Sequence, residues 1–252
     1  MEEKISDIKK RFENADEKSM RLLVEEYSHS DKAGVVKLAD KYRKHLEKLD
    51  AERIRVENML SYEKEYSMYL NICGIDEAGR GPLAGPVVAA AVILPKDARI
   101  LYVNDSKQLS EKKREELYDV IMKEAVSVGV GIASPARIDE INILQADYEA
   151  MREAVSKLNP APDILLNDAV IIPQLEMKQI SIIKGDAKSL SIASASIIAK
   201  VTRDRMMYEY DKLYPEYGFA SNKGYGSQAH IEALKQYGPC PIHRRSFIGN
   251  YV

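Results

Sequence analysis

The chain has 252 residues, of which 45% are hydrophobic and 30% are charged, and its formal net charge at pH 7 is -2. This length allows one large domain, or one domain with an appended segment. The near-neutral balance excludes an overall positive field of the kind that marks many nucleic-acid binders, although a cleft on a neutral protein can still be basic.

Cysteine content and apolar runs narrow the class of protein further. Cys73 and Cys240 are too few for a disulfide scaffold, and no Cys/His cluster has the spacing of a zinc site. The N-terminus lacks the basic-then-apolar pattern of a secretory signal, and the longest apolar run, Val87 to Leu94, is too short to span a bilayer. We therefore expect a cytoplasmic protein. We also expect a monomer, because nothing in the sequence demands a symmetric partner.

The first 70 residues are dense in charged side chains and contain no proline and one glycine, Gly34. Apolar residues then recur at helical spacing, which predicts an amphipathic helix from about Lys32 to Glu65. A shorter helix from about Asp16 to Tyr27 precedes it. We predict a helical hairpin over residues 1–70, which either packs one stripe on the main domain or makes an additional contact with nucleic acid or a protein partner.

From Asn71 onward, strands alternate with helices. Strands are predicted over Ile72–Ile75, Val87–Leu94, Ala125–Ala133, Ile164–Leu166 and Gln179–Ile183. Helices are predicted from the Ser110 cap to about Glu124, from Asp139 to Leu158, and from Ser191 to Tyr210. The alternation indicates an α/β domain with a mixed sheet flanked by helices over residues 71–252. The small residues of Ser189–Ala199 predict that the last of these helices lies close against the sheet.

Two adjacent acids, Asp76 and Glu77, end the first strand of this domain, and Gly79-Arg80-Gly81 follows them. Like charges side by side repel unless a cation neutralises them. The glycines let the backbone turn tightly and approach a ligand. The pattern favours a metal-dependent site whose amides contact a sugar-phosphate chain. A charged turn after a strand is the alternative.

Two more acids share this setting. Asp168 ends a later strand and Asp186 follows another, so they are expected to gather with Asp76 and Glu77 at one edge of the sheet. Four carboxylates can ionise together there only beside cations, and oxygen ligands suit Mg²⁺ or Mn²⁺. Two such ions activate a water and stabilise the leaving oxygen in phosphodiester cleavage. Taken singly, Asp168 and Asp186 are also explained as capping residues of turns.

Three further clusters fit a phosphate-bearing polymer. Asn104-Asp105-Ser106-Lys107 offers amides, a hydroxyl and a cation to a phosphate, or is an ordinary polar turn before a helix. Tyr225 lies between glycines, so its ring either packs on a sugar or base or anchors a loop. The basic segment His243–Phe247 either approaches phosphate or forms a surface tail.

These motifs together carry a family resemblance. Gly74-Ile75-Asp76-Glu77-Ala78-Gly79-Arg80-Gly81-Pro82 is similar to the signature opening of the type 2 ribonucleases H, specifically of bacterial ribonuclease HII. Asn104–Ser110 resembles the next block of that family, and Lys184-Gly185-Asp186 with Ile192–Asp204 resembles a third. Tyr217-Gly218-Phe219 and Lys223-Gly224-Tyr225-Gly226 complete the pattern. The motifs occur in order over about Asn71 to Gly249, which leaves the first 70 residues outside the resemblance.

The resemblance implies a ribonuclease H-like fold and an endoribonuclease that cuts the RNA strand of RNA/DNA hybrids. It also implies nicking on the 5′ side of single ribonucleotides embedded in duplex DNA, leaving a 5′-phosphate and a 3′-hydroxyl. The implied catalytic and metal-binding carboxylates, which hold two Mg²⁺ or Mn²⁺ ions, are Asp76, Glu77, Asp168 and Asp186. The implied substrate-binding residues are Gly79, Arg80, Gly81, Ser106, Lys107, Lys188 and Tyr225.

Within that set, two features are implied to select the sugar. Gly79, Arg80 and Gly81 are expected to read the ribose 2′-hydroxyl, largely through backbone groups. Tyr225 is expected to pack on the sugar at the RNA-to-DNA junction. The 2′-hydroxyl is the local group that distinguishes the two sugars.

Two other functions remain alternatives. A related metal nuclease, such as a transposase, integrase or junction resolvase, shares acidic metal sites but does not need the Gly79-Arg80-Gly81 segment or Tyr225. A catalytically silent module that binds hybrids would have at least one acid replaced, whereas all four candidates are present here.

Overall fold

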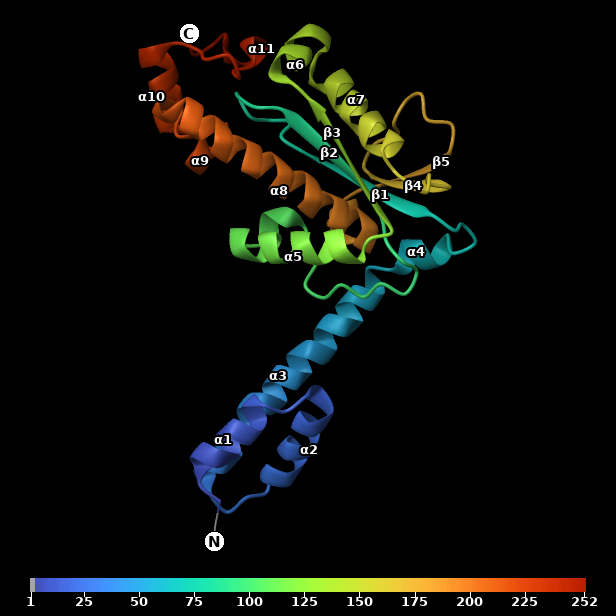
Figure 1. The fold of residues 1–252 in the computed structure, drawn as a ribbon, viewed down its shortest axis with the longest axis vertical. Coiled ribbons are helices and arrows are strands. Elements are labelled where there is room, and N and C mark those ends of the chain that lie inside the picture. Colours follow the sequence, from blue (N-terminus) through green and yellow to red (C-terminus); the bar gives the residue numbers. More distant parts are fainter. Residues whose placement is uncertain (1–2) are drawn as a thin grey trace. The chain divides into compact units, whose positions relative to one another are not determined.

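The computed structural model describes residues 3–252. The chain divides into two compact units, an N-terminal unit ending at Glu57 and a second unit of residues 58–252 (Figure 1). Within residues 3–252, no helix combines the length and the apolar character needed to cross a membrane.

The N-terminal unit consists of three helices, α1 (Ile5–Glu13), α2 (Glu17–Tyr27) and α3 (Ala33–Asn58). Both helices of the predicted hairpin are present as α2 and α3, and the prediction omitted α1. Asp16 caps α2, as expected, by accepting a hydrogen bond from the Ser19 amide at 2.8 Å. The helices share an apolar core, in which the rings of Phe12 and Tyr42 stack with their centroids 4.4 Å apart.

Five strands form the mixed sheet of the second unit, in the order β3-β2-β1-β4-β5. Their bounds are β1 (Ile72–Ala78), β2 (Val87–Ile93), β3 (Ser127–Ala133), β4 (Ile164–Asp168) and β5 (Lys178–Ile182). β1 pairs antiparallel with β2 and parallel with β4, so it occupies the centre of the sheet. The structure confirms the predicted mixed sheet flanked by helices.

Helices cover both faces of this sheet (Figure 1). On one face lie α6 (Pro135–Ile141) and α7 (Ile143–Ser156), and on the other lie α5 (Glu111–Glu124) and α8 (Leu190–Leu213). The residues of β1 alternate between the two faces, because successive strand side chains point in opposite directions. Ile75 packs in the cluster that contains the apolar side of α7, whereas Ile72 packs with Ile192 of α8.

The small residues at the start of α8 allow a close approach to β1, as predicted. A Cβ atom added to Gly74 would lie 2.1 Å from the backbone carbon of Ser191 and 2.3 Å from the Ile192 amide. Any side chain at position 74 would therefore push α8 away from the central strand. This contact places Ser196, one and a half turns farther along α8, beside the end of β1.

Two predicted helices are interrupted. The helix expected from Asp139 to Leu158 is broken at Asn142, whose φ of 69° ends α6 and whose side chain caps α7. The helix expected from Lys32 to Glu65 is broken before α4 (Ser61–Glu65), because the Met59 carbonyl accepts a hydrogen bond from the Leu190 amide at the start of α8. The spacing of apolar residues along the sequence cannot predict a hydrogen bond between residues so far apart in the chain.

The C-terminal part adds short helices around a second apolar cluster. They are η3 (Pro215–Tyr217), α9 (Phe219–Asn222), α10 (Gln228–Tyr237) and α11 (Arg245–Ile248). Within this cluster, His243 forms hydrogen bonds to His230 at 3.0 Å and to the Cys240 amide at 3.0 Å. The cluster also contains Leu83 and Ala84, so it packs directly against the loop between β1 and β2.

Candidate active site

The adjacent acids at the end of β1 face opposite sides of the sheet. Asp76 shares the α8 face with Gly74, and the Ser196 hydroxyl acts to lower the pKa of its carboxyl. Glu77 shares the α7 face with Ile75. The Ser196 hydroxyl also lies 3.0 Å from that of Ser106, which connects Asp76 to the loop before α5.

The electrostatics of these acids show strong mutual repulsion. Burial raises the pKa of Asp76 well above its usual range, and the charges of Glu77 and Asp168 raise it further. Burial also raises the pKa of Glu77, with Asp168 adding to the shift, while Arg80 and Lys107 act in the opposite direction. The site therefore has an excess of negative charge that a cation would relieve.

The other two acids come from the parallel half of the sheet. Asp168 is the last residue of β4, and its Oδ1 accepts a hydrogen bond from the Gly185 amide at 2.7 Å. That amide opens the short helix η2 (Gly185–Ala187), which carries Asp186. Burial raises the pKa of Asp186, and the charges of Asp105 and Asp168 raise it further.

Lys107 supplies a positive charge beside the acids. It lies in the short helix η1 (Ser106–Gln108), which Asp105 caps by accepting a hydrogen bond from the Lys107 amide at 2.9 Å. Burial opposes ionisation of Lys107, but the charges of Asp105, Asp76, Asp186 and Asp168 raise its pKa overall. Lys107 therefore faces the same negative region from outside the sheet.

A cavity of about 380 Å³ opens beside Glu77. Its lining includes the predicted substrate-binding residues Gly79, Arg80, Gly81, Ser106, Lys107 and Tyr225. It also includes Ala78, Ser196, Lys200 and Arg203. Lys188, the remaining predicted residue, is exposed at the end of η2 and does not line this cavity. Asp76, Asp168 and Asp186 do not line it either, and they are connected to it through Ser196 and Lys107.

One buried arginine holds the segment Gly79–Gly81, and a second holds the loop that follows it, roles that the sequence did not predict for either residue. Arg244 donates to the carbonyl oxygens of Gly79 at 2.5 Å, Arg80 at 2.9 Å and Gly85 at 2.9 Å. Arg203 donates to the carbonyls of Pro86 at 2.9 Å and Ala84 at 3.1 Å.

Gly79 is required by this packing. Its φ is 97°, and a Cβ atom there would lie 2.1 Å from Nε of Arg203. A side chain at this position would therefore strain the backbone and displace the buried guanidinium.

Tyr225 reaches the cavity on a segment that is tied to the same loop. The Gly224 carbonyl accepts hydrogen bonds from the amides of Leu83 at 2.8 Å and Ala84 at 3.3 Å. The side chain of Tyr225 stays 49% exposed, so its ring is free to contact a ligand. The loop is therefore anchored by the backbone of Gly224, and not by the ring of Tyr225.

The basic segment near the C-terminus is not a surface tail. His243 and Arg244 are 2% and 0% exposed, and the Arg244 amide donates to the Leu83 carbonyl at 2.9 Å. The sequence showed that this segment is basic. It could not show that Arg244 is buried and bonded to backbone carbonyls, because such contacts leave no pattern in the sequence. Arg244 thus supports the glycine segment rather than contacting phosphate.

The donors present suit a hard divalent ion that is shared with a ligand. Within residues 3–252, no three Asp, Glu, His or Cys side chains converge closely enough to hold an ion by themselves. Mg²⁺ is commonly bound through one or two carboxylates, several waters and substrate phosphates, rather than by a cage made only of protein. Asp76 and Asp186, with pKa values raised partly by neighbouring carboxylates, fit this mode.

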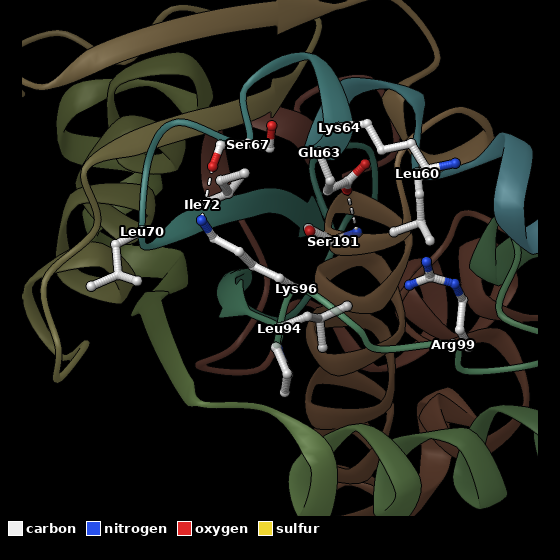
Figure 2. Close-up of a pocket in the computed structure, with 11 residues that line it drawn as sticks. Leu60, Glu63, Lys64, Ser67, Leu70, Ile72, Leu94, Lys96, Arg99 and Ser191 are labelled. Atoms are coloured by element: carbon white, nitrogen blue, oxygen red, sulfur yellow. Dashed lines mark hydrogen bonds between the residues drawn. The ribbon is translucent and has the colours of Figure 1, made fainter.

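A second, smaller cavity of about 90 Å³ lies away from these residues. Figure 2 shows that it is lined by α4 together with residues next to β1 and β2. Glu63 caps α8 there, because its Oε1 accepts hydrogen bonds from the Ser189 hydroxyl at 2.6 Å and the Ser191 amide at 3.0 Å. This cavity contains none of the predicted site residues, and we assign its contacts to helix capping.

Comparisons with known proteins agree with this arrangement. The family model described as Ribonuclease HII matches residues 73–250, and the model described as Ribonuclease HII N-terminal domain matches residues 4–67. The ribonuclease HII of Lachnoclostridium phytofermentans is 63% identical over 247 residues, covering 98% of this chain and 97% of that protein.

Solved structures show the same fold. The ribonuclease H2 of Pyrococcus horikoshii OT3 is 33% identical with a TM-score of 0.60, covering 70% of this chain and 93% of that one. Bst-RNase HIII, solved in complex with Mn²⁺, has a TM-score of 0.53 at 20% identity, covering 67% of this chain and 63% of that one. The second likeness concerns the fold alone.

Proposed function

The chain belongs to the ribonuclease HII family, and we propose that Asp76, Glu77, Asp168 and Asp186 form its catalytic centre. The family assignment establishes an endoribonuclease that acts on RNA/DNA hybrids and embedded ribonucleotides. The observation that carries the proposal for the site is the position of Glu77 and the Gly79–Gly81 segment on one cavity, beside acids that raise one another's pKa values.

The buried, mutually repelling acids of this chain suit a hard divalent ion. We propose that the four acids hold two Mg²⁺ or Mn²⁺ ions together with the scissile phosphate. Bound there, such ions would lower the pKa of a water and offset the charge of the departing 3′ oxygen. The products would be a 5′-phosphate and a 3′-hydroxyl.

The protein's own residues have separate tasks in this proposal. Ser196 favours the ionised form of the Asp76 carboxyl, which is the form that binds a cation. Lys107 contributes charge that attracts a backbone phosphate. The backbone of Gly79–Gly81, fixed by Arg244, contacts the ribose 2′-hydroxyl, and Tyr225 packs on the adjoining sugar. Lys188 remains a proposed phosphate contact outside the cavity.

The test uses a labelled DNA duplex that carries one ribonucleotide, with an all-DNA duplex as control, in Mg²⁺, Mn²⁺ or EDTA. We expect metal-dependent nicking on the 5′ side of the ribonucleotide, and its loss in the Asp76→Asn variant. Cutting of the all-DNA control at an equal rate would contradict the assigned sugar recognition. Full activity of Asp76→Asn would contradict the assigned catalytic centre.

We also propose that the N-terminal unit contacts the nucleic-acid backbone through a lysine face on α3. The face consists of four exposed lysines at helical spacing, Lys37, Lys41, Lys44 and Lys48. It extends about 16 Å along the helix, from the rise of 1.5 Å per residue. Exposed lysines at this spacing present a row of positive charge that complements phosphates.

The ion pairs of this unit support the assignment. Within residues 3–252, none of the four lysines forms an ion pair. Acids of the unit are paired instead with arginines; Glu17, for example, contacts Arg21 at 2.8 Å and Arg53 at 2.5 Å. Lys41 lies 5.5 Å from the centre of the Tyr42 ring, but no acid of the described residues neutralises any of the four lysine charges.

A further inference from the structure

A fifth carboxylate lies near the proposed catalytic centre, on α7 rather than at a strand end. Asp147 is 0% exposed, and within residues 3–252 neither of its side-chain oxygens has a hydrogen-bond partner. An ionised carboxyl buried in this way is costly unless a charged group compensates it. A buried carboxyl without hydrogen-bond partners is not explained by packing alone, so Asp147 requires another role.

The compensating group is Arg80. Its Nε lies 3.5 Å from Oδ2 of Asp147, while its Nη1 lies 3.5 Å from Oε1 of Glu77. Burial raises the pKa of Asp147 to about 8, and the charge of Glu77 raises it further, whereas Arg80 lowers it. Asp147 and Glu77 thus share one guanidinium, which lines the cavity.

We infer that Asp147 is a positioning residue that holds the Arg80 side chain and thereby the orientation of the Gly79–Gly81 segment. This inference rests on the proposed function of that segment. Arg244 fixes Arg80 by its backbone carbonyl, and Asp147 fixes it by its guanidinium. The residue is then held at both ends, which limits the rotation of the peptide groups that face the ribose. Without Asp147, the guanidinium would be attracted to Glu77 alone.

The test is a double-mutant cycle in the full-length protein with Asp147→Asn and Arg80→Gln. We expect Asp147→Asn to lower kcat/KM on the single-ribonucleotide duplex about tenfold, the loss typical of one charged contact. In the Arg80→Gln background the same change is expected to alter kcat/KM less than about twofold, because the partner is already absent. The melting temperature of Asp147→Asn is expected to stay equal or rise, since the desolvation cost of a buried carboxyl is removed.

Glu149→Gln is the matched control, because Glu149 lies on the same helix but pairs with Arg137 at 2.6 Å, outside the cavity. It is expected to leave kcat/KM unchanged. Equal losses from Asp147→Asn in both backgrounds, or a lower melting temperature with unchanged kcat/KM, would overturn the positioning role.

The melting temperatures of the cycle separate this inference from the proposed function. Additive shifts would show that the two side chains do not interact, which overturns the inference. Non-additive shifts together with a fully active Arg80→Gln variant would show that the contact exists but does not position the segment, which overturns the inference and leaves the proposed backbone role of Gly79–Gly81 standing. Non-additive effects on both melting temperature and kcat/KM support both proposals.

Discussion

The Arg244 guanidinium donates a hydrogen bond to the Arg80 carbonyl at 2.9 Å, across 164 positions of the chain. The donor is fully buried, while the side chain of the acceptor residue lines the cavity. Burial lowers the pKa of Arg244, and the nearby Arg203 guanidinium lowers it further. The C-terminal segment of the chain therefore contributes directly to the shape of the glycine segment that we assign to sugar recognition.

Replacing Arg244 with lysine is expected to weaken this support. A single ammonium group cannot donate in the three fixed directions of the bonds to Gly79, Arg80 and Gly85. We expect a fall of about 2–4 kcal/mol in the free energy of unfolding, measured by urea titration. Cleavage at a single ribonucleotide should also fall. The control Arg245→Lys, at an exposed neighbour, should change neither, and equal effects of the two variants would contradict the assigned role of Arg244.

Stability is expected to fall on acidification because of His243. Burial and the neighbouring His230 lower the pKa of His243 to about 4, so the folded protein disfavours its protonation. The unfolded chain takes up this proton near pH 6.5, which means that the stabilisation is complete above that pH and is lost as the pH falls toward 4. We expect a loss of about 2 kcal/mol between pH 7 and pH 5. Urea titrations should show a smaller loss for His243→Gln, and identical pH profiles would contradict the prediction.

The ring of Tyr225 is expected to matter for activity more than for folding. Because the ring is half exposed on the cavity, Tyr225→Ala should leave the melting temperature nearly unchanged. It should lower kcat/KM on the single-ribonucleotide duplex about tenfold, since stacking on an aromatic ring contributes about 1–3 kcal/mol. Tyr225→Phe keeps the ring and should retain most activity. Equal losses in both variants would indicate that the hydroxyl, and not the ring, makes the contact.

Neutralising the lysine face is expected to reduce the salt dependence of substrate binding. A variant with glutamine at its four positions should lower the slope of log K against log salt by up to about 3.6, at 0.9 per phosphate contact. Its kcat at saturating substrate should stay unchanged. The control carries the same change of charge on lysines outside the face, at Lys4, Lys9, Lys10 and Lys18. Equal slopes for the two variants would exclude a specific contact of the face with nucleic acid.

Much of the fold followed from local patterns in the sequence. The continuous apolar run at Val87 predicted β2, and the cap at Ser110 predicted the start of α5, because both signals lie within a few residues. The break at Asn142 was missed, since a residue with positive φ in the middle of a helical pattern is fixed by tertiary contacts. The short helix α1 was missed, although Ile5, Ile8 and Phe12 recur there at helical spacing.

In the site, too, residues with a local sequence signal were predicted, and residues that depend on tertiary contacts were missed. Glu77 and the Gly79–Gly81 segment formed one contiguous signal, and the structure places them on a single cavity. Arg203 and Asp147 gave no signal, because their importance depends on burial against distant segments. Lys188 lies exposed outside the cavity, and its predicted contact with substrate stays a prediction.

The opposite orientation of Asp76 and Glu77 gives the two helical layers separate influence over one reaction. Substitutions in α8 act first on Asp76 through Ser196, whereas substitutions in α7 act first on Glu77 and Arg80 through Asp147. An engineer can therefore adjust each acid from its own side of the sheet. Because the charge of Glu77 raises the pKa of Asp76, variants of the two layers are expected to combine non-additively.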